Sequence, residues 1–101
     1  MPGPNILIPP GPDATARFSE GFGPRFIVTV DTEEEFDWDA PLRRDGHSTA
    51  TVSALRQFQH FCEGFGVKPI YLIDYPVADS PHAPKAIGDA VAAGRAEIGV
   101  Q

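Results

Sequence analysis

FIVTVD, residues 26–31, is a nearly continuous run of apolar and β-branched side chains, and it decides the fold. Such a run is typical of a strand that is covered on both faces, as in a parallel sheet. It leads directly into a group of carboxylates, because six of the nine residues from Asp31 to Asp39 are acidic. Carboxylates this close repel one another unless water or a cation compensates their charge. The stretch therefore predicts a strand that ends in a functional loop.

The pattern beyond this stretch predicts alternating helices and strands. Residues 51–64 predict an amphipathic helix, with apolar positions at Val52, Leu55, Phe58, Phe61, Cys62 and Phe65. A second apolar strand is expected over residues 69–74, a short helix over 85–93 and a third strand over 97–100. Helical crossovers make such strands parallel. The expected fold class is α/β, with about three parallel strands and two helices.

The chain divides into an arm and a folded part. Residues 1–24 hold six of the eleven prolines and four of the ten glycines, which favours an irregular arm in which residues 6–8 can pack as a short edge segment. Residues 25–101 contain the predicted strands and helices. Three strands with no helix after the third neither close a barrel nor finish a sheet. We therefore expect residues 25–101 to be the first part of a larger α/β domain.

Composition excludes several functions. The net charge of −6 argues against non-specific binding to nucleic acid or to an anionic membrane surface. No apolar run approaches the roughly 20 residues that span a bilayer. The N-terminus lacks the basic and apolar regions of a secretory signal, so the cytoplasm is the expected location. The single cysteine, Cys62, excludes an internal disulfide and a cysteine-based zinc site, and its place in the helix pattern indicates burial.

Five residues near the predicted strand ends are candidates for a site. Asp31 ends the first strand, where it can serve as a general base or cap the following turn. Glu33 projects to the same side of extended backbone, as a partner in the site or as a solvated loop charge. Asp74 and Tyr75 end the second strand at the same edge of the sheet. Trp38 either anchors the loop on the core or stacks on a sugar.

The other polar residues of the loop are expected at the surface. The remaining carboxylates, which should be solvated or paired with Arg43 and Arg44, are Glu34, Glu35, Asp37 and Asp39. Surface positions are also expected for His60 and His82, whereas His47 belongs to the loop itself. A calcium-binding loop is excluded, because Phe36 stands where that loop needs glycine and Leu42 where it needs glutamate.

Three motifs, taken in order, resemble the start of the polysaccharide deacetylase family. They are FIVTVDTE (26–33), GVKPIYLIDYPV (66–77) and EIGVQ (97–101), and the first is similar to a divergent branch that reads VDTEEEFDW. The resemblance implies an irregular (β/α) barrel and the metal-dependent removal of N-acetyl, or sometimes O-acetyl, groups from a carbohydrate substrate. It implies that Asp31 is the base and that Glu33 binds a divalent metal, zinc. Asp74, Tyr75 and Trp38 are the expected substrate-binding residues.

The chain departs from the family pattern at two positions. Thr32 stands where the family usually has a second aspartate, so Glu33 must reach the metal with a longer side chain. Gln101 stands where the family places the first histidine of a metal-binding pair. The remaining ligands are therefore expected beyond residue 101, and the 101-residue chain is expected to be inactive alone. A magnesium-dependent phosphohydrolase, and a non-catalytic sugar- or partner-binding module whose metal site is lost, stay open as alternatives.

Overall fold

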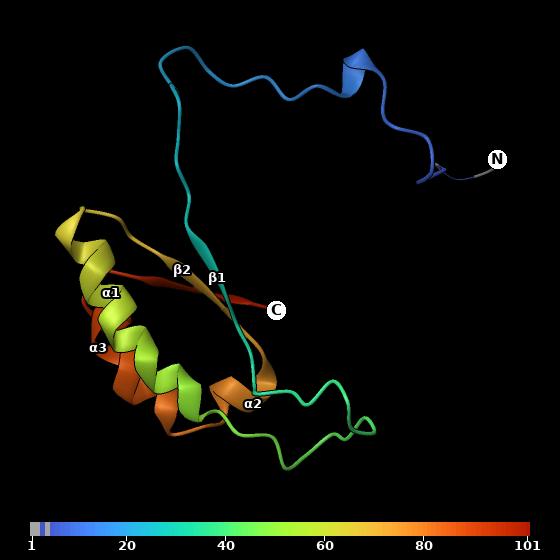
Figure 1. The fold of residues 1–101 in the computed structure, drawn as a ribbon. Coiled ribbons are helices and arrows are strands. Elements are labelled where there is room, and N and C mark those ends of the chain that lie inside the picture. Colours follow the sequence, from blue (N-terminus) through green and yellow to red (C-terminus); the bar gives the residue numbers. More distant parts are fainter. Residues whose placement is uncertain (1–2, 4) are drawn as a thin grey trace.

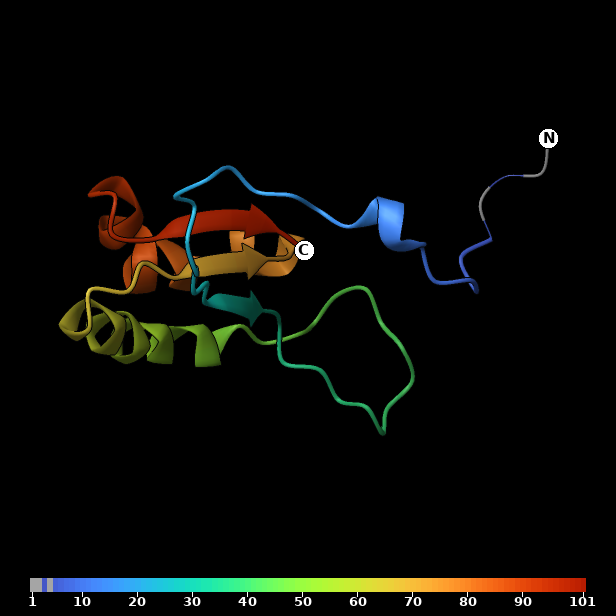
Figure 2. The same cartoon turned by 90° about the horizontal axis from the view of Figure 1, so that it is seen from above.

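The computed structural model describes residue 3 and residues 5–101. A parallel three-stranded sheet has the order β1 (Thr29–Thr32), β2 (Ile70–Ile73) and β3 (Glu97–Val100). Thr29 lies opposite Ile70, and Ile70 lies opposite Glu97. The three arrows point the same way in Figure 2. The α/β class and the parallel pairing of the strands are confirmed.

Helical segments connect the strands, and they are more broken than the sequence pattern indicates. The first connection holds the 3-10 helix η2 (Ala50–Ala54) and the helix α1 (Leu55–Gly64). The second holds α2 (Tyr75–Ala78), the π-helical turn η3 (Pro84–Gly88) and α3 (Asp89–Ala92). A short 3-10 turn, η1 (Pro12–Ala14), lies in the arm. The expected helices at 51–64 and 85–93 therefore exist, but each begins as a different kind of helix.

The main core lies on one face of the sheet. Tyr71 of β2 is fully buried and packs in a cluster with Ile87 of η3 and Ala90 of α3. Val30 of β1 and Phe58 of α1 pack against the same cluster. Because both connections contribute to it, α1, η3 and α3 cover the same face of the sheet (Figure 1).

The opposite face of the sheet carries the predicted base. Successive residues of a strand point to opposite faces. Val30 packs in the core and Thr32 is buried, whereas Thr29 and Asp31 are exposed. Asp31 therefore projects from the face opposite the helices, near the carboxyl end of β1.

A buried polar pair joins α1 to the sheet. The hydroxyl of Tyr71 donates a hydrogen bond to Gln59 Oε1 at 2.9 Å, and Gln59 Nε2 donates to the carbonyl oxygen of Arg95 at 3.2 Å. Burial raises the pKa of Tyr71 to about 12. The bonds hold α1, β2 and the start of β3 in one arrangement, and they satisfy two side chains that would otherwise be costly to bury.

The first strand is shorter than expected. It begins at Thr29, whereas Phe26 and Ile27 are exposed and lie outside it. Pairing stops at Ile70 because the residues just before it form the turn that follows α1. Gly66 lies in this turn, and its φ of +66° suits glycine. Without a paired neighbour, an apolar run does not continue as a strand in this sheet.

The apolar side of α1 is wider than the surface that covers it. Cys62 is buried as expected, but Phe61 and Phe65, which belong to the same apolar pattern, are 62% and 72% exposed. With Phe26 they line an apolar pocket of about 400 Å³ at the start of β1. The apolar segment at residues 6–8 is also exposed, and the arm runs away from the sheet (Figure 1). The expected edge packing of that segment is therefore wrong.

Among the described residues, no helix combines the length and the apolar character needed to cross a membrane.

Candidate functional site

The carboxyl ends of the three strands meet at one edge of the sheet, and polar residues follow each of them. Glu33 follows β1, Asp74 follows β2 and Gln101 follows β3. The backbone N–H of Gln101 donates to the carbonyl oxygen of Ile73 at 3.0 Å, and its side-chain amide donates to Glu33 Oε1. The ends of the first and third motifs, 68 residues apart in sequence, are therefore in contact.

The two residues predicted to act on the substrate and the metal share a pocket. Asp31 and Glu33 both line a pocket of about 110 Å³, together with Thr51, Val52 and Leu55 from the start of the first helical connection. Thr32 lies between them with its side chain buried, and its hydroxyl donates to the carbonyl oxygen of Val30 at 3.0 Å. Asp31 and Glu33 are therefore neighbours at the end of β1, with the side chain of Asp31 on the face opposite the helices, and their chemical roles stay predictions.

A pair of carboxyl groups links the ends of β1 and β2. Hydrogen bonding with the side chain of Asp74 raises the pKa of Glu34 above its usual value. Asp74 also begins α2, because its Oδ1 accepts a hydrogen bond from the N–H of Val77 at 3.1 Å. Asp74 thus shapes this edge of the sheet by capping α2. Glu34 is half-buried against it, so the expectation that Glu34 pairs with an arginine or lies free in water is wrong.

The other charged residues of the loop are exposed, as expected, but without arginine partners in the described part of the chain. Asp37 and Asp39 are exposed, and Asp37 Oδ1 accepts a hydrogen bond from the N–H of Asp39 at 3.0 Å. The ion pairs formed among the described residues join Lys68 to Glu97 and Arg95 to Glu63, all outside the loop.

The base of the loop is closed by hydrogen bonds that local sequence patterns do not reveal. The N–H of Glu35 donates to the carbonyl oxygen of Ser48 at 2.7 Å, and Glu35 Oε1 accepts from the N–H of Thr51 at 3.0 Å. Thr49 Oγ1 lies 2.8 Å from His82 Nδ1, in a contact between residues 33 positions apart. His82 is therefore half-buried, and its expected surface position is wrong.

Aromatic rings gather inside the loop. The ring of Phe36 lies 4.8 Å from the ring of Trp38 at an angle of 51°, and 5.1 Å from His47 at 22°. His47 Nε2 donates to the carbonyl oxygen of Arg43 at 2.7 Å. Trp38 is 83% exposed, so it does not anchor the loop on the core. Tyr75, the first residue of α2, is also exposed.

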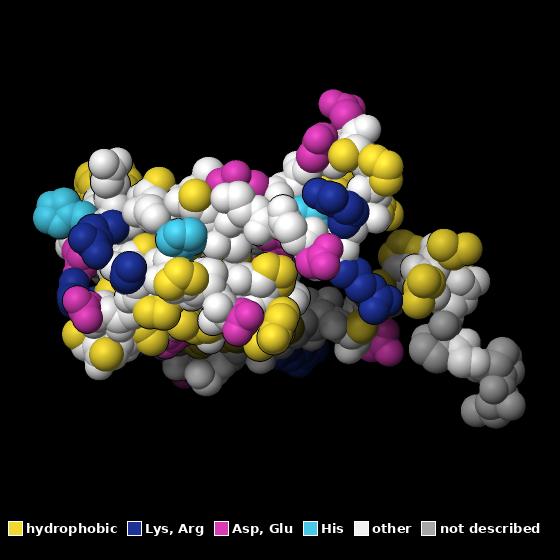
Figure 3. All heavy atoms as spheres, turned by 90° about the horizontal axis from the view of Figure 1, so that it is seen from below, with side chains coloured by type: hydrophobic (Ala, Val, Ile, Leu, Met, Phe, Trp, Pro, Cys, Tyr) yellow, Lys and Arg dark blue, Asp and Glu magenta, His cyan; other side chains and the backbone are white. Residues whose placement is uncertain are grey.

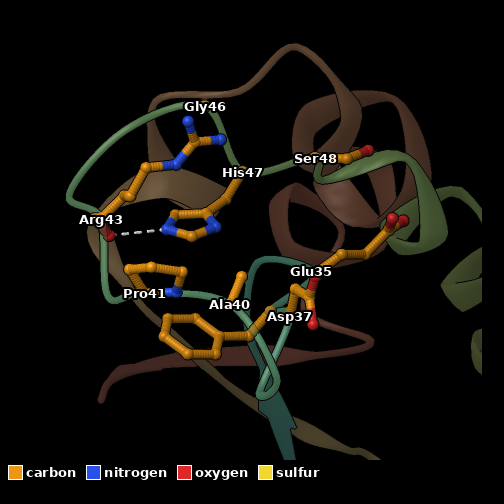
Figure 4. A pocket seen from close by; sticks show the side chains of 9 residues that line it. Glu35, Asp37, Ala40, Pro41, Arg43, Gly46, His47 and Ser48 are labelled. Atoms are coloured by element: carbon orange, nitrogen blue, oxygen red, sulfur yellow. Dashed lines mark hydrogen bonds between the residues drawn. The ribbon is translucent and has the colours of Figure 1, made fainter.

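The loop encloses a hollow of about 650 Å³, which is larger than the pocket at Asp31. Its lining combines aromatic, acidic, basic and hydroxyl groups, and Figure 4 shows the His47 ring directed into the middle of the loop, toward Arg43 and Pro41. In Figure 3 the loop protrudes from the body and carries acidic, basic and apolar side chains together. The sequence analysis assigned Glu35, Asp37 and His47 to this loop but did not predict that the loop encloses a hollow.

The described residues do not form a complete metal site. Among residues 3 and 5–101, no three histidine, cysteine, aspartate or glutamate side chains come together in a way that suits a metal ion. Catalytic zinc usually takes three protein ligands. Asp31 and Glu33 supply two carboxylates, and the neighbouring Gln101 supplies an amide that already donates to Glu33.

Comparison with protein-family models, curated proteins and solved structures finds no match. The function is therefore inferred from the residues of this chain.

Proposed function

We propose that this chain carries the first part of the catalytic edge of a hydrolase that removes acetyl groups from N-acetylated sugars. The reaction breaks a non-peptide C–N bond, as in the polysaccharide deacetylases that the three motifs resemble. The single observation that supports the proposal is the meeting of these motifs at one edge of the sheet. Asp31 and Glu33 share a pocket there, and Gln101 contacts Glu33 from the end of β3.

The arrangement suits the proton transfer that amide hydrolysis requires. Asp31 is an exposed carboxylate on the open face of the sheet, and a carboxylate in that position can accept a proton from the water that attacks an amide carbonyl. A divalent ion, zinc by the resemblance, would activate this water and stabilise the developing oxyanion. Such an ion needs protein ligands besides Glu33, because Asp31 is the proposed base. Glu33 is the residue proposed to bind it.

The fold agrees with the barrel that the resemblance implies. The strands follow one another in the order β1-β2-β3, and α1, η3 and α3 cover one face of the sheet. A (β/α) barrel is built in the same way, with helices outside and active-site residues at the carboxyl ends of the strands. We propose that these three strands are the first of such a barrel and that Asp31 faces its interior.

Zinc binding offers a sharp test, because one substitution supplies the ligand type that the family has. In the full chain, Gln101→His places an imidazole beside Glu33, so we expect this variant to bind Zn²⁺ with 1:1 stoichiometry in isothermal titration calorimetry. Adding Glu33→Gln should abolish that binding. Gln57→His, at an exposed position of α1, is the matched control. A Gln101→His variant that binds no zinc, or binds it equally well without Glu33, would contradict the shared edge.

Acetate release from tetra-N-acetylchitotetraose is measured on the same proteins. The unmodified chain should release none, because its ligand set is incomplete. If the unmodified chain does release acetate and Asp31→Asn does not, the chain is active alone. That result would contradict the expected inactivity of the chain but would support the proposed reaction. If the chain is active alone, the loss in Asp31→Asn should be about 10²–10⁴-fold, which is the usual contribution of general-base catalysis.

The contact between Gln101 and Glu33 also favours a second candidate function. An amide that donates to the carboxylate occupies one of the oxygens that a metal would use. A sugar-binding module without catalysis would keep this contact. It would bind chitotetraose equally well in the presence of a chelator and after Asp31→Asn, whereas the hydrolase should lose affinity or activity in at least one of these experiments.

A further inference from the structure

We infer that a second hollow, between η2, α1 and η3, is an anion site that binds a phosphate group. This basic hollow has a volume of about 270 Å³ and is lined by Ser53, Arg56, His82, Lys85 and Ala86. It is formed by the two helical connections, away from the open face of the sheet that carries Asp31. The inference therefore goes beyond the proposed function and does not depend on it.

The polar side chains around the basic hollow are cationic or donate hydrogen bonds. Arg56 carries a guanidinium, Lys85 an ammonium and Ser53 a hydroxyl. In the described part of the chain no carboxylate lines this hollow, although the whole chain has a net charge of −6. The acids nearest to Lys85 in sequence, Asp79 and Asp89, are exposed and lie outside the lining. A hollow lined by charge of one sign attracts ligands of the opposite sign.

The two strongest cations of the basic hollow are not neutralised by ion pairs. The ion pairs formed among the described residues use Lys68 and Arg95, so neither Arg56 nor Lys85 is paired with a carboxylate there. Arg56 Nη2 donates to the backbone carbonyl oxygen of Lys85, which joins α1 to η3. A guanidinium has five N–H donors, so this bond positions the group and leaves further donors for a ligand.

His82 adds a third nitrogen donor at the border of the basic hollow. Its ring is half-buried, and its Nδ1 lies 2.8 Å from Oγ1 of the buried residue Thr49. When the threonine hydroxyl donates to Nδ1, the neutral ring carries its proton on Nε2. A protonated ring carries a proton on Nε2 as well. The contact with Thr49 therefore fixes the ring and keeps Nε2 as a donor for an anion.

Contacts between distant segments build the basic hollow. The bond from Arg56 to Lys85 spans 29 positions, and the contact between Thr49 and His82 spans 33. Pro84–Gly88 is a π-helical turn, and such turns are rare and are frequent at functional sites. Because two connections hold the ligand groups in place, little conformational entropy is lost when a ligand binds.

A phosphate group suits this set of donors. Arginine binds phosphate oxygens through two parallel N–H bonds, and lysine supplies a point charge. The remaining oxygens of the tetrahedral group can accept from His82 and Ser53. The net charge of −6 opposes a large polyanion such as a nucleic acid. The ligand class is therefore inorganic phosphate or a small phosphate monoester.

Calorimetric titration of the full chain with inorganic phosphate at low ionic strength tests the site. We expect saturable binding with 1:1 stoichiometry. Arg56→Gln should raise the dissociation constant about tenfold, because a charge-assisted hydrogen bond is lost. Arg44→Gln removes the same charge from an exposed position in the loop and should leave the dissociation constant unchanged. The site is refuted if phosphate produces no saturable heat, or if Arg44→Gln weakens binding as much as Arg56→Gln does.

A second pair of variants guards against damage to the contact between α1 and η3. His82→Asn should also weaken phosphate binding, whereas His60→Asn, at an exposed position of α1, should not. Far-ultraviolet circular dichroism checks that all variants are folded. If His82→Asn is folded and binds phosphate as the original chain does, the proposed set of donors is wrong.

Two other anions identify the source of the phosphate group. Phenyl phosphate that binds more tightly than inorganic phosphate would uphold the site and assign it to a monoester, whereas weaker binding would uphold it and assign it to free phosphate. Acetate that binds as tightly as phosphate would overturn the inference, because the site would then respond to negative charge alone.

Discussion

Replacing Tyr71 by phenylalanine should destabilise the fold that positions the site, and the size of the effect follows from one hydrogen bond. The Tyr71 hydroxyl is the donor to Gln59 Oε1 at 2.9 Å, and both side chains are buried. Tyr71→Phe removes the donor and leaves a buried acceptor unsatisfied, which costs about 1–3 kcal/mol. Stabilities of small proteins are only about 5–15 kcal/mol, so this is a large fraction.

Urea unfolding measures this loss. With a urea dependence of roughly 1–3 kcal/mol per molar, a loss of about 2 kcal/mol lowers the midpoint by about 1 M. Gln59→Leu made in the Tyr71→Phe background should cost less than in the original chain, because no hydroxyl is then left unsatisfied, and the coupling should be about 0.5–3 kcal/mol. Tyr75→Phe, at an exposed tyrosine, should change stability by less than about 0.5 kcal/mol. A Tyr71→Phe variant as stable as the original, or a double-mutant cycle without coupling, would refute the reasoning.

Three further predictions concern titration and packing. Burial raises the pKa of Tyr71 from 10 to about 12, so the folded state holds this proton more tightly than the unfolded state does. The free energy of unfolding should therefore be unaffected by this group below pH 10 and should fall as the pH rises from 10 to 12. Absorbance of tyrosinate measures the ionisation, and the melting temperature measures the loss of stability. Gly99→Ala should destabilise the sheet by about 1 kcal/mol in thermal unfolding, because its Cβ would lie 2.6 Å from Leu72 Cδ2 and that side chain must rotate away. The hydrogen bond with Asp74 raises the pKa of Glu34, so the proton on Glu34 stabilises the folded state below pH 4.5, and this effect is lost as the pH rises. Glu34→Gln should remove this part of the pH dependence of the melting temperature.

Matched variants separate these effects from general damage. Gly64→Ala has no atom within 4 Å of the added Cβ and should leave stability unchanged or slightly higher. Asp79→Asn, an exposed acid after α2, should leave the pH dependence as it is. If Gly64→Ala destabilises as much as Gly99→Ala, the clash with Leu72 is not the cause. If the melting temperature of Glu34→Gln depends on pH as that of the original chain does, the contact of Glu34 with Asp74 is not the cause of this pH dependence.

The sequence was sufficient for features that depend on local pattern. Apolar and β-branched runs identified all three strands, and helical connections between them made the sheet parallel. The same reasoning placed Cys62 in the core and Asp31 at the carboxyl end of its strand. These features follow from residue spacing because the periodicity of a strand or helix determines which side chains share a face.

The tertiary structure decided what depends on neighbours distant in sequence. The apolar period of α1 includes Phe61 and Phe65, but only the packing of η3 and α3 determines how much of that side is covered, and it leaves both rings exposed. The contact of Gln101 with Glu33 spans 68 positions and depends on the register of three strands. The closure of the loop by Glu35 likewise depends on where η2 begins. Spacing along the chain assigns a residue to a face, whereas register and packing decide which residues meet across it.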